Sequence, residues 1–543
     1  MNPSVRATIW DLSGRPADLL VIGGGATGAG IAREAAQRGF SVALIDRHDF
    51  AWGTSSRSSR LIHGGLRYLE QRRWGLVFEG LRERRTLLRI APHLVRPLAF
   101  LLPVYRGDRV PRWKIEAGLL LYDLLSLRGN VRRHRVLSKR RLLAREPRLR
   151  DRGLQGGALY WDAQCDDARL TLATVRAAAA AGARVANYVD ALELEQQNGR
   201  VIGALVEDRL SGARSVVRAR LVVNAAGPWA DAVRRLEDPR AEPLLRPTRG
   251  AHVMVPRQRI GHQHAITFMS PLDGRVMFVL PWGAQSYIGT TETDATESPE
   301  AVHATADDVV YLLRSANALF PPARLTEADV LASWAGLRPL LLSEPGTPAG
   351  SVSREHRVLT GPGGMLTVAG GKLTTYRRMA EDVVRHAERL LGRPAAAPGS
   401  SLPTAELPLP GGETTALEGF GSLGLELGLG SETVAHLLRH YGAETPAIYA
   451  LVRQHRDLAE RLHPDHPAIA AEVVHHARRE FARRVDDVLV RRIHLRSETR
   501  DAGLAAAARS AALLAEQLGW DETRQREEVE RYRALCAEDY LRT

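Results

Sequence analysis

The amino-acid sequence predicts an α/β protein that carries a separate helical domain toward its C-terminal end. Three observations support this prediction. A strand–helix–strand pattern occupies residues 18–46, strand signals recur through residues 246–295, and the periodicity beyond residue 415 is helical with few β-branched runs. A chain of 543 residues can bury several cores, so two or three domains are expected.

The first pattern is a complete βαβ unit with a glycine fingerprint. A buried strand over residues 18–22 runs into Gly-Gly-Gly-Ala-Thr-Gly at 23–28, then a helix-compatible run stops at Gly39 and a second strand over 42–46 ends in Asp46. In such a unit the glycines make the turn, admit a pyrophosphate and pack helix on strand, while the helix N-terminus supplies amide donors. An acid placed like Asp46 binds a ribose hydroxyl. The unit predicts a dinucleotide site of the Rossmann type.

Two features favour FAD over a nicotinamide dinucleotide. The fingerprint opens the chain, and a second strand–turn–helix follows about two hundred residues later, at 221–229. A Gly-Gly-Lys segment then comes at 370–372, so three separated segments can converge on one long ligand. No second βαβ fingerprint unit is predicted, and the glycine-rich stretch at 419–430 is not interpreted as a phosphate loop, so a nicotinamide domain is not expected.

One lysine stands out because lysine is nearly absent. The chain has three lysines against seventy-two arginines, and Lys372 lies in Val-Ala-Gly-Gly-Lys-Leu-Thr-Thr-Tyr at 368–376. A compact, rotatable ammonium enters a tight pocket that a planar guanidinium cannot, and flanking glycines let ligand and backbone approach closely. Lys372 is therefore a candidate functional residue, although an isolated lysine of this kind is more often a solvent-facing side chain at a helix start.

Composition excludes several classes of function. The two cysteines, Cys165 and Cys536, form no C-x-x-C pair, so we expect no metal site and no disulfide framework. The N-terminus lacks the pattern of a signal peptide. No stretch is as long as the run of about 18 apolar residues that a transmembrane helix needs. The net charge of +13 consists mostly of arginine and fits genome composition and solvated surface, so no nucleic-acid partner is expected.

An apolar stretch over residues 115–127 carries basic residues on both sides. A helix with such flanks suits the surface of an anionic membrane, where its apolar face is buried among the lipids. An ordinary core helix explains the same leucines equally well, and the sequence leaves both interpretations open.

The remaining elements alternate along the chain. The patterns predict helices at 76–91, 170–181 and 306–319, strands within 184–224, and a strand at 330–336. Residues 393–415 are rich in Pro, Ala, Gly and Ser and predict a linker.

These residues carry a close resemblance to a known family. The strings Leu-Ile-His-Gly-Gly-Leu-Arg-Tyr-Leu-Glu at 61–70 and Gly-Gly-Lys-Leu-Thr-Thr-Tyr-Arg at 370–377 are far more specific than the dinucleotide fingerprint. Through them the chain resembles the FAD-dependent glycerol-3-phosphate dehydrogenases, within the wider D-amino-acid-oxidase-like group of flavoproteins. The resemblance covers essentially the whole chain and is weaker in the C-terminal part. Two positions depart from the family pattern: Arg60 stands where lysine is frequent, and Asp46 where glutamate is common.

The resemblance implies the domain organisation. A discontinuous FAD-binding domain of the Rossmann-like type would span residues 1–395. It would receive an inserted antiparallel-sheet substrate-binding (capping) domain, to which approximately residues 70–160 and 245–345 contribute. The linker at 393–415 would lead to a C-terminal helical domain at 416–543.

The resemblance also implies a reaction, the oxidation of sn-glycerol 3-phosphate to dihydroxyacetone phosphate by hydride transfer to flavin N5. A cationic cradle would hold the phosphate, because a guanidinium matches phosphate oxygens bidentately. A histidine would take the hydroxyl proton, because an imidazole titrates near working pH. The expected substrate-binding residues are Arg67, Tyr68, Arg338, Arg354 and Lys372, and the expected catalytic residues are His63 or His252 as the base, with Arg338 and Lys372. The expected FAD-binding residues are Gly23, Gly25, Ala26, Thr27, Gly28, Asp46, Thr54, Ser55, Ser56, Ser59, Leu61, Ile62, His63, Ala225, Gly227, Trp229, Gly371, Lys372, Leu373 and Thr374.

The electrons would pass to a diffusible acceptor, either a membrane quinone or dioxygen. The oxidase branch of the resemblance has an insertion that this chain lacks, which favours quinone. Quinone predicts a cytoplasmic protein bound peripherally to the anionic inner face of the plasma membrane, and a homodimer stays open. Two alternatives of other classes remain, an amino-acid oxidase of the same fold and a non-catalytic flavin-bound module that senses redox state.

Overall fold

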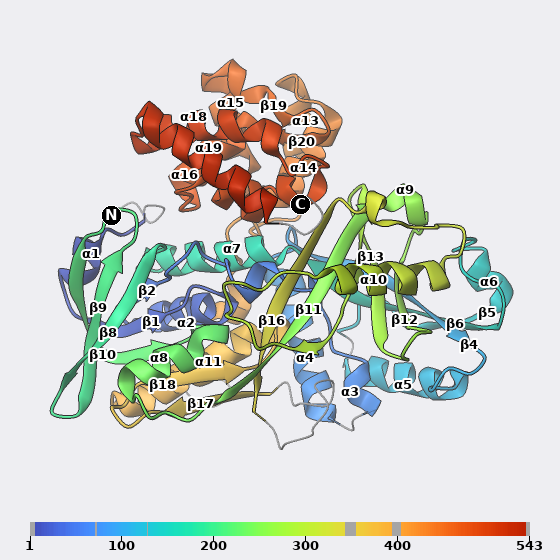
Figure 1. The fold of residues 1–543 in the computed structure, drawn as a ribbon, viewed down its shortest axis with the longest axis horizontal. Helices are drawn as coiled ribbons and strands as arrows, with labels where there is room; N and C mark the ends of the chain where they lie inside the picture. Colours follow the sequence, from blue (N-terminus) through green and yellow to red (C-terminus); the bar gives the residue numbers. More distant parts are fainter. Residues whose placement is uncertain (1–5, 71–72, 127–128, 343–354, 394–402, 539–543) are drawn as a thin grey trace.

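The computed structural model describes residues 6–70, 73–126, 129–342, 355–393 and 403–538 (Figure 1). Two sheets lie beside each other, and the C-terminal helices are stacked above them. This arrangement confirms the α/β class and the separate helical domain. No helix in the described ranges is both long and apolar enough to cross a bilayer.

The first sheet is built on the predicted βαβ unit. Its central strands β10, β1 and β2 pair in parallel. Strands β1 and β2 and the C-terminal end of β10 are buried on both faces, which is why these stretches are almost continuously apolar. Across the described residues the strand order is β17-β18-β10-β1-β2-β7, and a β8–β9 hairpin continues from β10. The strands are β1 Ala17–Ile22, β2 Val42–Ile45, β7 Arg184–Ala186, β8 Val189–Gln197, β9 Arg200–Asp208, β10 Arg214–Asn224, β17 His356–Thr360 and β18 Leu366–Gly370.

Helix α2 (Ala26–Gln37) follows β1 and packs between α7 (Asp167–Ala180) and α11 (Tyr376–Leu390). Small residues on α2 make this close packing feasible. A Cβ atom on Gly30 would lie 3.0 Å from Cδ2 of Tyr376, tighter than nearly all real contacts of that kind. Two further helices, α1 Ile9–Ser13 and α8 Ala230–Glu237, flank this sheet.

The second sheet takes its strands from two stretches of the chain, 61–165 and 245–341. Its pairs are antiparallel except one, because β12 pairs with β4 in parallel. The strands are β3 Leu61–Ile62, β4 Val95–Tyr105, β5 Arg135–Ser138, β6 Leu154–Cys165, β11 Leu245–Pro256, β12 Ala265–Met269, β13 Val276–Trp282, β14 Gln285–Gly289, β15 Thr293–Asp294 and β16 Ala332–Leu341. The accompanying helices are α3 Arg67–Glu70, α4 Trp74–Ile90, α5 Arg112–Leu125, α6 Lys139–Leu143, α9 Arg257–Ile260 and α10 Ala306–Leu319.

The C-terminal domain is helical with one short β-hairpin that the sequence did not predict. The glycine-rich string at 419–424 has the spacing of a dinucleotide fingerprint, but it lies inside α13 and so forms no phosphate loop. The elements are α13 Glu418–Glu426, α14 Ser431–Tyr441, α15 Thr445–Gln454, β19 Arg461–His463, β20 His466–Ile469, α16 Ala470–Arg479, a π-helical turn Asp487–Arg492, α17 Leu495–Glu498, α18 Leu504–Leu518 and α19 Glu522–Ala537.

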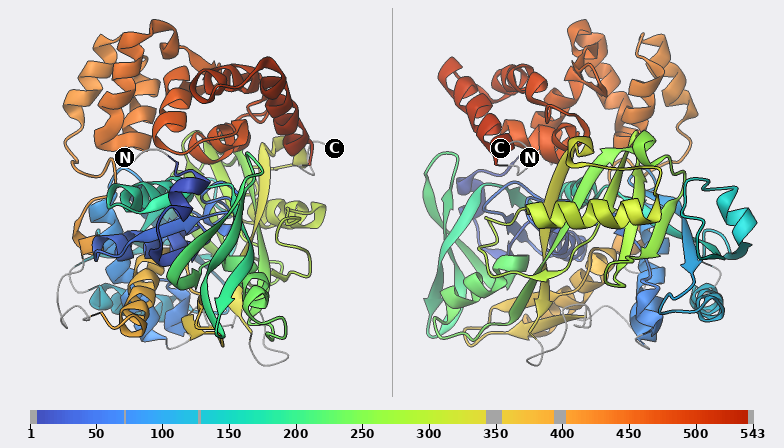
Figure 2. Two further views of the ribbon diagram at one scale, coloured as in Figure 1. Left: turned by 90° about the vertical axis from the view of Figure 1, so that its left-hand side faces the viewer. Right: turned by 45° about the vertical axis from the view of Figure 1, so that its right-hand side comes forward.

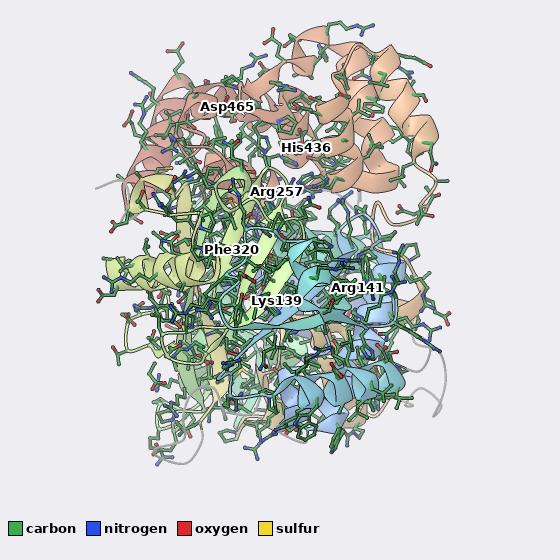
Figure 3. The ribbon with its side chains drawn as sticks, turned by 90° about the vertical axis from the view of Figure 1, so that its right-hand side faces the viewer. Lys139, Arg141, Arg257, Phe320, His436 and Asp465 are labelled. Atoms are coloured by element: carbon green, nitrogen blue, oxygen red, sulfur yellow. The ribbon has the colours of Figure 1, made fainter. Side chains whose placement is uncertain are left out.

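This domain sits on both sheet domains (Figures 2 and 3). In Figure 3, His436 and Asp465 mark the C-terminal domain, and Phe320 and Lys139 mark the second sheet domain below it. Part of the predicted linker is packed rather than extended: α12 (Pro403–Glu406) lies on α2, where Thr404 is buried and Arg33 donates to the Leu407 carbonyl oxygen at 2.7 Å.

Buried polar pairs join the C-terminal domain to α7. Arg169 donates to both carboxylate oxygens of Glu480, at 3.0 and 2.8 Å. His494 Nε2 lies 2.6 Å from Asp166 Oδ2. Together with His440 these two residues form a group that could in principle bind a metal ion, because their ligand atoms lie within 4.8 Å of one another. A tetrahedral zinc ion would hold neighbouring ligand atoms about 3.3 Å apart. The 2.6 Å contact is therefore the length of a hydrogen bond between His494 and Asp166, not of two ligands on one metal.

Candidate active site

A cavity of about 510 Å³ opens at the carboxyl ends of the parallel strands, where the first sheet faces β11 and β16 of the second. Ligands of open α/β sheets bind at this edge. Most of the predicted FAD-binding residues line the cavity, namely Gly23, Gly25, Ala26, Thr27, Asp46, Thr54, Ser55, Ser59, Leu61, His63, Ala225, Gly227, Trp229, Gly371, Lys372, Leu373 and Thr374. Three do not line it: Gly28, Ser56 and the fully buried Ile62.

The glycine fingerprint has the geometry that a pyrophosphate needs. Gly23 has φ +111°, and a Cβ there would lie 2.6 Å from the Ala225 carbonyl oxygen. Gly28 does not face the cavity but packs on the turn, because its Cβ would lie 1.8 Å from the Gly23 oxygen. Gly25 is the N-cap of α2 and offers no side chain as a cap, and the first helical amide, that of Ala26, donates to Ser55 Oγ at 2.9 Å. The turn therefore fits the phosphates of FAD at a helix N-terminus.

Asp46 lies at the end of β2, as the fingerprint predicts. Its carboxylate accepts hydrogen bonds from the backbone N–H groups of Gly24 at 2.7 Å and His48 at 2.8 Å. Burial raises the pKa of Asp46 to about 7. Residues 189–192 also line the cavity, and the Val189 N–H donates to the Asp46 carbonyl oxygen at 2.7 Å. This segment was not predicted, because nothing in that strand sequence marks it.

Arg338 and Lys372 line the part of the cavity that is remote from Asp46. Lys372 follows β18, and in the sheet β10 and β1 lie between β18 and β2, the strand that leads to Asp46. Arg338 belongs to β16, which packs against β18. Neighbouring strands lie about 4.8 Å apart, so the two regions are separated by roughly 14 Å across the sheet. Arg338 donates to Thr290 Oγ1 at 3.0 Å. Lys372 Nζ lies 4.9 Å from the ring centroid of Tyr68, which is a cation–π distance.

His63 also lines the cavity, beside the turn that carries Lys372. Its backbone N–H donates to Thr374 Oγ1 at 3.2 Å. The other predicted base, His252, is only 2% exposed; its Nε2 lies 2.9 Å from Ser59 Oγ and its ring stacks on Trp334.

The expectation that His252 titrates near working pH is not met. Burial, with the charges of Arg338 and Arg60, lowers the pKa of His252 to about 3. The cause is tertiary, because Arg60 comes from a distant loop and its guanidinium lies between Trp282 and Trp334, at 4.3 and 5.4 Å from their ring centroids. His252 is therefore a neutral imidazole at working pH.

Two predicted phosphate ligands cannot be placed. Arg354 lies outside the described residues, and the backbone of Arg67 begins α3 while its side chain lies outside the described part of the structure. Several lining residues were missed by sequence reasoning, although Pro228 and Tyr376 lie inside the strings singled out above; the others are loop or strand residues that no motif marks. The missed residues are Arg47, His48, Trp52, Arg57, Ser58, Pro228, Gly250 and Tyr376.

Comparison with known proteins places the chain. The sequence profile of the FAD dependent oxidoreductases matches residues 18–377, and that of the C-terminal domain of alpha-glycerophosphate oxidase matches residues 402–525. The chain is 37% identical to a glycerol-3-phosphate dehydrogenase of Synechocystis sp., over 96% of this chain and 97% of that protein. It is 35% identical to the aerobic glycerol-3-phosphate dehydrogenase of Staphylococcus aureus (strain USA300), over 88% and 86%. The structure of glycerol-3-phosphate dehydrogenase from Bacillus halodurans, complexed with FAD, matches with a TM-score of 0.81 and 30% identity, covering 98% and 97%.

The protein belongs to the FAD dependent oxidoreductase family, and FAD is its cofactor. Within that family it belongs with the glycerol-3-phosphate dehydrogenases, because those relatives match it from the first strand through the C-terminal domain. The resemblance found in the sequence strings at 61–70 and 370–377 is thereby confirmed.

Proposed function

We propose that this protein oxidises sn-glycerol 3-phosphate to dihydroxyacetone phosphate and passes the electrons to a membrane quinone. The observation that carries the proposal is the presence of both Arg338 and Lys372 in a cavity that also holds the dinucleotide fingerprint. Two cations suit a dianionic phosphate, whereas an amino-acid oxidase needs only a carboxylate clamp beside an apolar pocket. The names of the relatives point to the same substrate.

The flavin, when bound, supplies the hydride acceptor at N5. The chain's residues then have to orient the substrate and take one proton from its hydroxyl. Arg338 and Lys372 hold the phosphate end, and Lys372 also stabilises negative charge that develops near the ring. Both His63 and His252 line the cavity. His63 is the better candidate base, because it lies beside the turn of Lys372, whereas a pKa of about 3 makes His252 a weak proton acceptor and its Nε2 is hydrogen-bonded to Ser59.

The quinone proposal is supported by an exposed apolar surface on the side opposite the C-terminal domain (Figure 1). Helix α5 turns Leu119 and Tyr122 inward, whereas Trp113, Leu120 and Leu124 are 70%, 56% and 64% exposed. The spacing of these three residues puts them on one face of the helix, which we call the α5 stripe.

The surroundings of the α5 stripe suit an anionic bilayer. On the neighbouring helix α4, Trp74 and Phe78 are 45% and 40% exposed. Exposed basic residues flank the stripe, namely Lys114, Arg132 and Arg133. Apolar side chains with basic flanks dock on anionic headgroups, and a quinone dissolved in the bilayer would then be within reach.

Anaerobic titration tests the substrate. Glycerol 3-phosphate added to the purified protein should bleach the oxidised-flavin absorbance at about 450 nm. A quinone analogue should then restore the colour faster than air. Fast recovery in air alone would favour the oxidase alternative, and bleaching by amino acids but not by glycerol 3-phosphate would contradict the substrate proposal. Flavin that no substrate bleaches would favour the redox sensor.

Vesicle sedimentation tests the membrane surface. The double variant Leu120→Ser/Leu124→Ser should lose binding to vesicles that contain phosphatidylglycerol and keep the same rate of bleaching in solution. The control, Leu425→Ser, removes a leucine of similar exposure (54%) from the C-terminal domain and should bind like the wild type. Equal binding of all three proteins would refute the α5 stripe as the docking surface.

A further inference from the structure

The backbone next to His63 is held by a buried hydroxyl from helix α5. The Gly64 N–H donates to Tyr122 Oη at 2.9 Å, and both residues are buried. A Cβ atom at position 64 would lie 2.7 Å from Tyr122 Oη and 2.8 Å from Leu81 Cδ2, so the contact requires glycine. Nothing in the string at 61–70 identifies this partner, which is about sixty residues further along the chain.

The direction of the Tyr122 hydroxyl is fixed from behind. It donates to Asp162, whose two carboxylate oxygens lie 2.8 and 3.0 Å from Oη. Arg84 in turn donates to the same carboxylate at 2.5 Å and to the Trp161 carbonyl oxygen at 2.9 Å. Tyr122, Asp162 and Arg84 are 1%, 2% and 0% exposed. Because the hydroxyl proton is directed at the carboxylate, a lone pair is left to accept from Gly64.

The same segment rests on α4 next to Lys372. A Cβ atom on Gly80 would lie 3.1 Å from Gly64 Cα, 3.1 Å from Lys372 Nζ and 3.2 Å from the His63 carbonyl oxygen. The turn at 63–65 and the Lys372 ammonium therefore share one packed surface. A small displacement of Gly64 therefore moves His63 relative to Lys372. In the proposed reaction these two side chains must face opposite ends of one small substrate.

We infer that Tyr122 is a positioning residue of the active site, which holds the turn at 63–65 through the Gly64 amide and so sets the distance between His63 and Lys372. This inference rests on the proposed function, because it gives His63 and Lys372 their roles. Removing the acceptor leaves a buried N–H unpaired, which costs about 1–3 kcal/mol. That free energy corresponds to a change of about 5–150-fold in the equilibrium between the held and the released conformation of the turn.

The test compares Tyr122→Phe with the control Tyr160→Phe. Tyr160 is also a buried tyrosine, 5% exposed, but its hydroxyl contacts Thr267 at 3.0 Å. Both variants should fold and bind flavin. Only Tyr122→Phe should speed deuterium exchange in the peptide covering residues 61–66, by about 5–150-fold. It should also lower kcat for glycerol 3-phosphate by at least about tenfold with KM changed about twofold or less, because the phosphate cations stay in place.

The outcomes separate this inference from the proposed function. Wild-type exchange and kcat in Tyr122→Phe would overturn the inference and leave the function intact. If glycerol 3-phosphate does not bleach the wild-type flavin, the proposed function fails, and the exchange comparison still decides whether Tyr122 holds the turn. Equal effects in both tyrosine variants would show a general loss of packing and would also overturn the inference.

Discussion

Arg338 reaches the cavity over a position of β11 that has no side chain, two residues along from its register partner Thr248. Gly250 in β11 neighbours Arg338 across the β11–β16 pair, and a Cβ there would lie 2.4 Å from Arg338 Nη2. Gly250→Ala should therefore displace the guanidinium and reduce kcat/KM for glycerol 3-phosphate by about 10–100-fold, mostly through KM. Steady-state kinetics at equal flavin content would measure this.

The control for that prediction is Gly419→Ala, at a helical position with open space around the added methyl group. It should leave kcat/KM unchanged. A Gly250→Ala enzyme with wild-type KM would show that Arg338 does not bind the substrate phosphate.

His252 gives a residue-scale prediction about pH. Its folded-state pKa of about 3 lies below the ordinary value of 6.5, so folding favours the neutral ring. The stability that it contributes is fully present above pH 6.5 and is lost as the pH falls from 6.5 toward 3. From pH 7 to pH 5 the wild type should lose about 2 kcal/mol more unfolding free energy than His252→Gln. Urea unfolding of both proteins at the two pH values checks this, and parallel losses would contradict the buried neutral state.

The residues that sequence reasoning placed well are those fixed by local backbone geometry. The spacing of Gly23 and Gly25 fixes a turn, so their place in the cavity could be predicted from six residues of sequence. The ionisation of His252 could not, because Arg60 and Trp334 reach it from distant segments. The same limit hid Tyr122, whose partner Gly64 is remote in the chain.

At the scale of elements, local periodicity predicted the helices closely and the pairing of strands poorly. Helix α10 covers the predicted residues 306–319, and α4 begins two residues before its predicted start. The parallel pairing of β12 with β4 was beyond prediction, because it joins strands more than 150 residues apart. Helix α5 is only partly a core helix: Leu119 belongs to the core, and Leu120 and Leu124 face outward.

The first turn of α2 makes a testable element-scale case. A Cβ at Gly28 would lie 1.8 Å from the Gly23 carbonyl oxygen, a backbone atom that cannot swing away as a flexible side chain could. Gly28→Ala should therefore open the phosphate turn and yield protein with little flavin, measured as the ratio of absorbance near about 450 nm to 280 nm. Gly30→Ala makes the same change two residues later, against the ring of Tyr376 at 3.0 Å, and should keep most of its flavin. Equal flavin in both variants would contradict the close-packing role of Gly28.

At the scale of the whole molecule, the C-terminal domain is joined to the FAD domain close to the Asp46 end of the cavity. Asp49 follows Asp46 by three residues and is fully buried. It accepts from Arg491 Nε at 2.6 Å and from Arg492 Nη1 at 2.7 Å, both from the π-helical turn. Burial alone would raise the pKa of Asp49, but the two arginines hold it below the ordinary value.

Asp49→Ala should weaken the attachment of the C-terminal domain, because it leaves two buried guanidinium groups without this carboxylate. Removing one partner of a buried ion pair costs about 3–5 kcal/mol, far more than the pair itself stabilises. We expect a lower unfolding midpoint and faster proteolysis in the packed segment at 403–415 that joins the domains. The control, Asp457→Ala, breaks an ion pair with Arg509 whose side chains are 60% and 42% exposed, and it should leave both measurements nearly unchanged. If the two variants behave alike, the ionic contacts of Asp49 do not hold the domains together, and the apolar contacts between them must suffice.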